Sequence, residues 1–94
     1  MNEVLKAAIE KYGAQAQVVV ALEEMAELQQ ALTKFLRGNP DQRNINEEMA
    51  DVSIMLEQLK LIFGNRAAVT HWEHKKLTRL ESRLKSSSAT NSTG

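Results

Sequence analysis

Two short acidic motifs lie inside apolar segments of the sequence. "EEMAEL" begins at residue 23 and "EEMADV" begins at residue 47, and each places an acid three residues after its second glutamate. On an α-helix, residues three apart differ by about 60° around the axis and by roughly 4.5 Å along it. Glu24 and Glu27 should therefore share one helix face, as should Glu48 and Asp51.

These two carboxylate pairs border apolar neighbours rather than a charged stripe. A short connection between their helices predicts an antiparallel hairpin, which can bring the pairs together. Four carboxylates at a half-buried point repel one another, and burial disfavours their ionised form. A hard divalent cation resolves this conflict, and a chain without cysteine favours Mg²⁺, Mn²⁺ or Ca²⁺ over zinc. The alternative is that all four are ordinary solvated helix residues.

The first glutamate of each motif has a separate explanation. Glu47 follows Asn44 by three residues in "NINE", which is the pattern of a helix capping box. Glu23 is expected to face solvent. We therefore expect Glu23 and Glu47 to support the metal ligands or to lie on the substrate side, rather than to bind the metal themselves.

Helix is the only regular structure that the sequence favours, because Ala, Leu, Glu, Gln, Lys and Met dominate it. Asn2 is a possible N-cap, Gly13, Gly38 and Gly64 are expected stops, and the third helix begins either at Asn44 or just after Asn39. The predicted helices cover residues 2–12, 14–36, 44–63 and 67–85, and the polar tail 86–94 is expected to be disordered.

Two apolar stripes are predicted on the central helices from their helical spacing. The stripe of the second helix comprises Leu22, Met25, Gln29, Leu32 and Leu36, and that of the third comprises Val52, Met55, Leu56, Leu59, Ile62 and Phe63. The fourth helix adds Val69, Trp72, Leu77, Leu80 and Leu84. This is more apolar surface than so short a chain covers easily, so a homodimer or a homotetramer is expected.

Length and composition limit the class of protein. The 94 residues suffice for one helical domain, assigned to residues 1–85. Twelve basic residues balance twelve acidic ones, which argues against a nucleic-acid partner. Neither a membrane-spanning run nor the apolar core of a signal peptide is found, and with no cysteine a cytoplasmic location is expected.

The longest segments of the sequence carry a resemblance to a known family. "ALEEMAELQQALTKFLRG" followed by "NINEEMADVSIMLEQL" resembles the MazG-like all-α nucleoside triphosphate pyrophosphohydrolases, whose signature is Glu-Glu-x-x-Glu on one helix and Glu-x-x-Asp on the next. "KYGAQAQ" and "HWEHKKLTRLESRL" are similar to the corresponding segments of small, phage-type members. The resemblance thus extends over about residues 2–85 and implies a four-helix MazG-like bundle.

The resemblance also implies an activity. Glu24, Glu27, Glu48 and Asp51 would be the catalytic acids that bind Mg²⁺, with Mn²⁺ as a substitute. The substrate would be a (deoxy)nucleoside triphosphate, cleaved between its α and β phosphates to a monophosphate and pyrophosphate. Such a reaction serves nucleotide-pool housekeeping.

Further residues are candidates for contacts with the substrate. Lys76, Arg79 and Arg83 lie three and four residues apart, so they share one helix face and are placed to meet a triphosphate. Tyr12 is a candidate for stacking on the base and Gln17 for reading its edge, although such residues are more often part of a core or an interface. His71, Trp72 and His74 are weaker candidates.

Two other classes of protein share some of these sequence features. A di-iron or di-manganese bundle also uses inward carboxylates, but it usually requires Glu-x-x-His, which neither Glu24 nor Glu48 provides. A non-enzymatic helical interaction module with exposed acidic faces is the remaining alternative.

Overall fold

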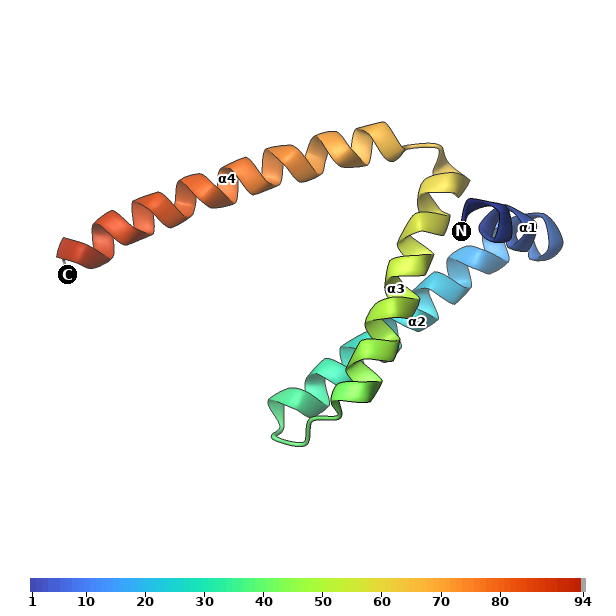
Figure 1. Ribbon diagram of the computed structural model, residues 1–94, viewed down its shortest axis with the longest axis horizontal. Coiled ribbons are helices and arrows are strands. Elements are labelled where there is room, and N and C mark those ends of the chain that lie inside the picture. Colours follow the sequence, from blue (N-terminus) through green and yellow to red (C-terminus); the bar gives the residue numbers. More distant parts are fainter. Residues whose placement is uncertain (94) are drawn as a thin grey trace. The chain divides into compact units, whose positions relative to one another are not determined.

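The computed structural model describes the backbone of residues 1–93 and the side chains of residues 1–86. It contains four α-helices and, among these residues, no strand, which confirms the predicted all-α class (Figure 1). The helices are α1 (Asn2–Tyr12), α2 (Ala14–Leu36), α3 (Gln42–Phe63) and α4 (Arg66–Thr93). The chain divides into two compact units, Met1–Gly64 and Asn65–Gly94, and each is described by itself.

Helices α2 and α3 form the predicted hairpin and lie side by side in Figure 1. The end of α2 is closed by two backbone hydrogen bonds, from Gly38 N–H to the Phe35 carbonyl at 3.1 Å and from Asn39 N–H to the Lys34 carbonyl at 3.0 Å. Gly38 adopts a φ of 82°, a conformation that favours glycine. The chain therefore reverses within a few residues, as the Gly-Asn-Pro sequence predicts.

The contact between α2 and α3 is a seam with alternating spacings of three and four residues. On α2 the seam contains Gln17, Ala21, Glu24, Leu28 and Ala31, and on α3 it contains Ile45, Glu48, Val52, Met55, Leu59 and Ile62. Each of these side chains is buried or half-buried. This spacing is the one that keeps two packed helices in register along their length. Glu24 and Glu48 are thus part of the packing surface itself.

Within the predicted apolar stripe of α2, Met25 is half-buried and the other members are exposed. Leu22, Leu32 and Leu36 are exposed by 62%, 44% and 81% of their surface, whereas Ala21 and Ala31 are almost fully buried. Small side chains at the seam let two helix backbones approach closely, and the larger leucines lie on another side of α2. On α3 the prediction is correct for Val52, Met55, Leu59 and Ile62, whereas Leu56 and Phe63 are exposed.

The predicted start of α3 is wrong in both of its versions. Asp41 is the N-cap, and its side-chain oxygen accepts a hydrogen bond from the Asn44 N–H at 3.1 Å. The helix therefore begins at Gln42, before the expected capping box. Glu47 instead accepts a hydrogen bond from Arg43 Nε at 3.2 Å, one turn away on the exposed side. An aspartate cap satisfies the first-turn N–H groups as well as an asparagine does, so composition alone did not separate them.

Helix α1 is attached to the hairpin through a buried glutamine. Gln58 of α3 is 2% exposed, and its Nε2 donates to the Leu5 carbonyl at 3.4 Å. Leu5 is itself buried. The expected cap of α1 is wrong by one residue, because Met1 is the N-cap, Asn2 is the first helical residue, and no side chain caps this end.

Helix α4 makes up the second unit and begins at Arg66. It continues to Thr93, past the predicted end at Lys85, because the sequence offers no glycine or proline stop before Gly94. The side chains of residues 87–94 lie outside the described part of the structure, and the disorder expected for the tail 86–94 stays a prediction. Among the described residues, no helix is both long and apolar enough to span a bilayer.

Candidate metal centre

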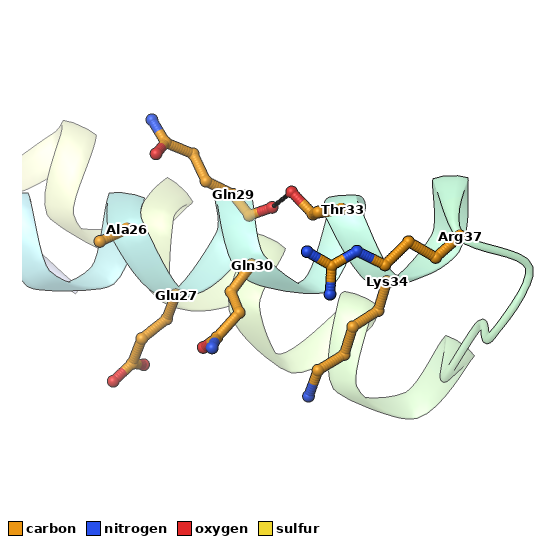
Figure 2. Close-up of a pocket in the computed structure, with 7 residues that line it drawn as sticks. All are labelled: Ala26, Glu27, Gln29, Gln30, Thr33, Lys34 and Arg37. Atoms are coloured by element: carbon orange, nitrogen blue, oxygen red, sulfur yellow. Dashed lines mark hydrogen bonds between the residues drawn. The ribbon is translucent and has the colours of Figure 1, made fainter.

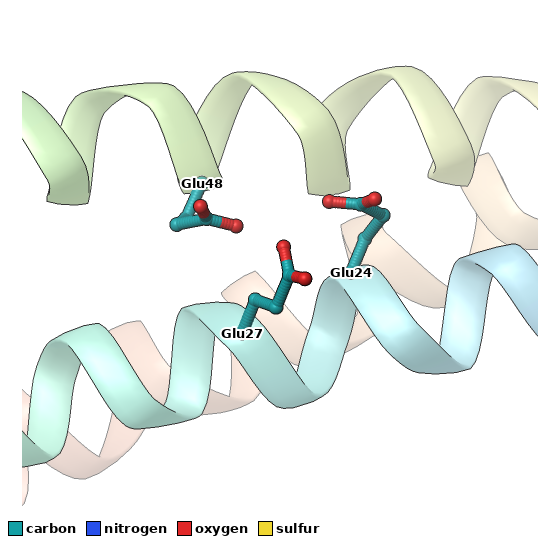
Figure 3. Close-up of side chains that lie close together, drawn as sticks. All are labelled: Glu24, Glu27 and Glu48. Carbon is teal, nitrogen blue, oxygen red and sulfur yellow. The ribbon is translucent and has the colours of Figure 1, made fainter.

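Three carboxylates meet between α2 and α3. One oxygen from each of Glu24, Glu27 and Glu48 can be chosen so that the three atoms lie within 4.8 Å of one another. Figure 3 shows Glu24 and Glu27 projecting from α2 toward α3, and Glu48 projecting from α3 toward α2. The sequence prediction that acids from both central helices converge is therefore correct for these three side chains.

The positions of these acids follow from the helix geometry. Glu24 and Glu48 occupy seam positions, so each points toward the opposite helix and is half-buried. Glu27 lies one turn after Glu24 at the border of the seam and is exposed. The cluster therefore has an inner part that is shielded by packing and an outer side that is open to solvent.

The electrostatics of the cluster are those of crowded acids. The pKa of Glu24 is raised from 4.5 to about 7, chiefly because partial burial disfavours the charged form and next because Glu27 and Asp51 carry the same charge. The neighbouring Asp51 side chain and the charge of Glu48 add to this pKa shift. Glu24 is thus held close to protonation at neutral pH.

Glu48 experiences a similar environment from the side of α3. Its pKa is raised by burial first, then by the neighbouring Glu27 side chain, and further by the charges of Asp51 and Glu47. Asp51 itself is exposed and one turn after Glu48. Because its charge acts on both Glu24 and Glu48, the fourth predicted acid belongs to the same electrostatic cluster, although its oxygens are not among the three closest.

Two oxygens of the cluster are left without a hydrogen-bond partner. The Oε2 atoms of Glu24 and Glu48 are buried and have no hydrogen-bond partner. A buried acceptor without a partner is unfavourable, and neighbouring like charges add to this cost. The donor set contains carboxylate oxygens only, which suits Mg²⁺, Mn²⁺ or Ca²⁺.

The supporting acids lie outside this cluster. Glu23 is exposed. Glu47 is paired with Arg43, and 62% of its side chain is exposed. Its charge raises the pKa of Glu48, so it lies near enough to influence the site electrostatically. Their predicted roles toward metal or substrate stay predictions.

Two predicted base contacts belong to the first unit. Gln17 is buried at the seam, two turns before Glu24 on the same face of α2. Tyr12 is 59% exposed at the end of α1, and the Nζ of Lys11 lies 5.4 Å from the centre of its ring. The exposed ring is available for stacking, whereas Gln17 is engaged in the core.

The predicted phosphate-binding residues lie on α4. Lys76, Arg79 and Arg83 are all exposed there. Trp72 is also exposed, with His71 edge-on at 5.7 Å between ring centres and Lys75 Nζ 5.6 Å from its ring centre. Since α4 is described by itself, the contact of these cations with a phosphate chain stays a prediction.

A groove along α2 was missed by the sequence analysis. It has a volume of about 530 Å³ and is lined by Ala26, Glu27, Gln29, Gln30, Thr33, Lys34 and Arg37 (Figure 2). The available signal was the recurrence of polar side chains at helical spacing after Glu27.

Comparison of the chain with protein-family models, with curated proteins and with solved structures found no match. The carboxylate geometry and the sequence resemblance are therefore the basis for a functional assignment.

Proposed function

We propose that the protein is a divalent-metal-dependent nucleoside triphosphate pyrophosphohydrolase. The observation that carries the proposal is the group of Glu24, Glu27 and Glu48. One oxygen from each lies within 4.8 Å of the others, and the half-buried Glu24 and Glu48 each have a buried oxygen without a partner. The sequence resemblance to the MazG-like family supports the same assignment. Mg²⁺ is the expected ion, and Mn²⁺ is an expected substitute.

The carboxylates have a defined task in this proposal. Glu24, Glu27, Glu48 and Asp51 would hold the metal between the two helices, with Glu24 and Glu48 as the shielded ligands. When bound, Mg²⁺ neutralises charge on the phosphate chain and lowers the pKa of water. A carboxylate oxygen that is not engaged with the metal would orient the attacking water and accept its proton.

The reaction breaks one phosphoanhydride bond. Water attacks the α phosphorus. The bond between that phosphorus and the oxygen that bridges the α and β phosphates breaks, and pyrophosphate leaves with the bridging oxygen. The proton released by the water passes to the accepting carboxylate. Lys76 and Arg79 would stabilise charge on the departing group, as cations commonly do in phosphoryl transfer.

The decisive experiment is a product analysis with a panel of nucleoside triphosphates and deoxynucleoside triphosphates in the presence of Mg²⁺. Monophosphate and pyrophosphate should appear together, without a diphosphate intermediate. Asp51→Asn should lower kcat strongly, by a factor on the order of 10² to 10³, because a charged ligand is lost near the reacting groups. Arg79→Ala should reduce kcat/KM less than Asp51→Asn does.

Two results would contradict the proposal. Diphosphate and orthophosphate as first products would show a different reaction, even if the protein bound metal. An absence of both hydrolysis and metal binding would favour the alternative of a helical interaction module. Exposed Glu3→Gln on α1 serves as a matched control, since it removes one carboxylate far from the cluster in sequence and should leave kcat unchanged.

A further inference from the structure

The α2 groove joins the carboxylate cluster to a basic region at the turn of the hairpin. Glu27, at one end, belongs to the cluster, whereas Lys34 and Arg37 line the other end. Figure 2 shows Glu27, Gln30 and Lys34 projecting from the same side of α2, with the guanidinium of Arg37 extending back along the helix. The groove thus has an acidic end and a basic end.

The two cations have no acidic partner among the described residues. Within those residues, the ion pairs engage Arg43, Lys60 and Lys85 instead. Lys34 also lines a second hollow of about 410 Å³ at the start of α3, together with Asp41, Arg43, Asn44 and Glu47. Favourable interaction with the carbonyl end of α2 is one reason for cations at these positions. It does not explain why they line a groove that reaches the cluster.

The spacing suits an extended polyanion that begins at the metal. Lys34 follows Glu27 by two helical turns, and at 1.5 Å per residue this is roughly 10 Å along the axis. The long, flexible side chain of Lys34 and the backward reach of Arg37 shorten that span (Figure 2). Gln30 lies between Glu27 and Lys34 along α2, and its side-chain amide offers N–H donors. Donors are therefore present along the whole path from Glu27 to Arg37.

We propose that Lys34 and Arg37 bind the terminal phosphates of a nucleoside triphosphate whose phosphate chain lies along the α2 groove. This inference rests on the proposed function, because a metal held by Glu24, Glu27 and Glu48 would fix one end of the phosphate chain. Arg37 can bind a phosphate group through two parallel N–H bonds, and Lys34 supplies a compact positive charge. The site would favour triphosphates over monophosphates, which lack the terminal groups.

The inference is tested by measuring binding of inorganic tripolyphosphate and of a nucleoside monophosphate by calorimetry in the presence of Mg²⁺. The variants are Lys34→Gln and Arg37→Gln, with Lys6→Gln as the control, because Lys6 is an exposed cation of α1 that lines neither hollow. Each groove variant should weaken tripolyphosphate binding about tenfold, whereas Lys6→Gln stays within about twofold of the unaltered protein. Monophosphate affinity should not change in any of them.

The outcomes separate this inference from the proposed function. If triphosphate hydrolysis occurs and both groove variants match Lys6→Gln in kcat/KM and in tripolyphosphate affinity, the subsite is wrong and the function stands. If tripolyphosphate binding depends on Lys34 and Arg37 but no triphosphate is hydrolysed, the function is wrong and the subsite stands. Equal loss of monophosphate and tripolyphosphate affinity would overturn the inference that these residues recognise terminal phosphates.

Discussion

At the scale of single residues, Glu24 and Glu48 stand out because they occupy seam positions that a helical hairpin normally fills with apolar side chains. Two acids at such positions weaken the hairpin unless a cation lies between them. Their buried Oε2 atoms lack hydrogen-bond partners, and the unfavourable free energy of burying them would be offset if a metal bound there. Glu24 and Glu48 therefore serve both as packing residues of the hairpin and as proposed metal ligands.

Substitution of Glu48 tests this relation directly. Mg²⁺ should raise the Tm of the unaltered protein by on the order of 5 °C at saturating concentration, because a ligand that binds only the folded form stabilises it. Glu48→Gln should abolish that increase and leave the metal-free protein as stable or more stable, since repulsion is relieved. A thermal melt with chelator and with Mg²⁺ measures both. Unfolding of the metal-free variant would show instead that Glu48 is structural.

The pH dependence of stability follows from the raised pKa of Glu24. The folded form holds the proton more tightly than the unfolded form, whose pKa is near 4.5. Its contribution to stability is thus fully present below about pH 4.5 and is lost as the pH rises through about 7. Urea unfolding of the metal-free protein should give a free energy of unfolding that decreases over this range. Glu24→Gln should flatten the decrease, and an increase with pH in the unaltered protein would contradict the assignment.

At the scale of helices, α3 begins at Gln42, six residues before Glu48. Asp41 fixes that start by accepting from the Asn44 N–H. Asp41→Ala should lower the free energy of unfolding by about 1 kcal/mol, the usual effect of losing such a cap. Asn44→Ala is the matched control and should have little effect, because the Asn44 backbone, not its side chain, makes the bond. If urea titrations show that Asn44→Ala is the more destabilising variant, the predicted capping box at Asn44 is favoured over the Asp41 cap.

At the scale of the whole molecule, the first unit has large apolar side chains outside its core. Leu22, Leu32 and Leu36 on α2 and Leu56 and Phe63 on α3 are all exposed. Exposed apolar surface of this kind favours self-association. The predicted homodimer or homotetramer therefore remains the expected state.

Light scattering at micromolar concentration should report a mass of at least twice the 10.5 kDa of one chain. Leu32→Asp should shift the protein toward monomers, because a buried charge at an interface is unfavourable. Glu23→Asp, at an exposed position of the same helix, should not change the mass. A monomer in the unaltered protein would remove the prediction.

The sequence by itself determined the helices and the pairing of acids on them. The bounds of α1 and α2 and the end of α3 agree with prediction, because they depend on local backbone hydrogen bonds and on Gly13, Gly38 and Gly64. The faces shared by Glu24 and Glu27, and by Glu48 and Asp51, follow from the helical repeat. Helix bounds and shared helix faces depend on residues close in sequence, and not on the segments that pack against the helix.

Only the tertiary structure decided which face of each helix is packed. The seam uses Ala21 and Ala31 rather than the leucine stripe, and no local rule selects between them, because the choice depends on how closely two segments distant in the sequence can approach. The same contact raises the pKa of Glu24, through burial and through the charges of Asp51 and Glu48 on α3. Burial and the Coulomb field of neighbouring charges are properties of the assembled hairpin, and for that reason they appear only once α2 and α3 are in contact.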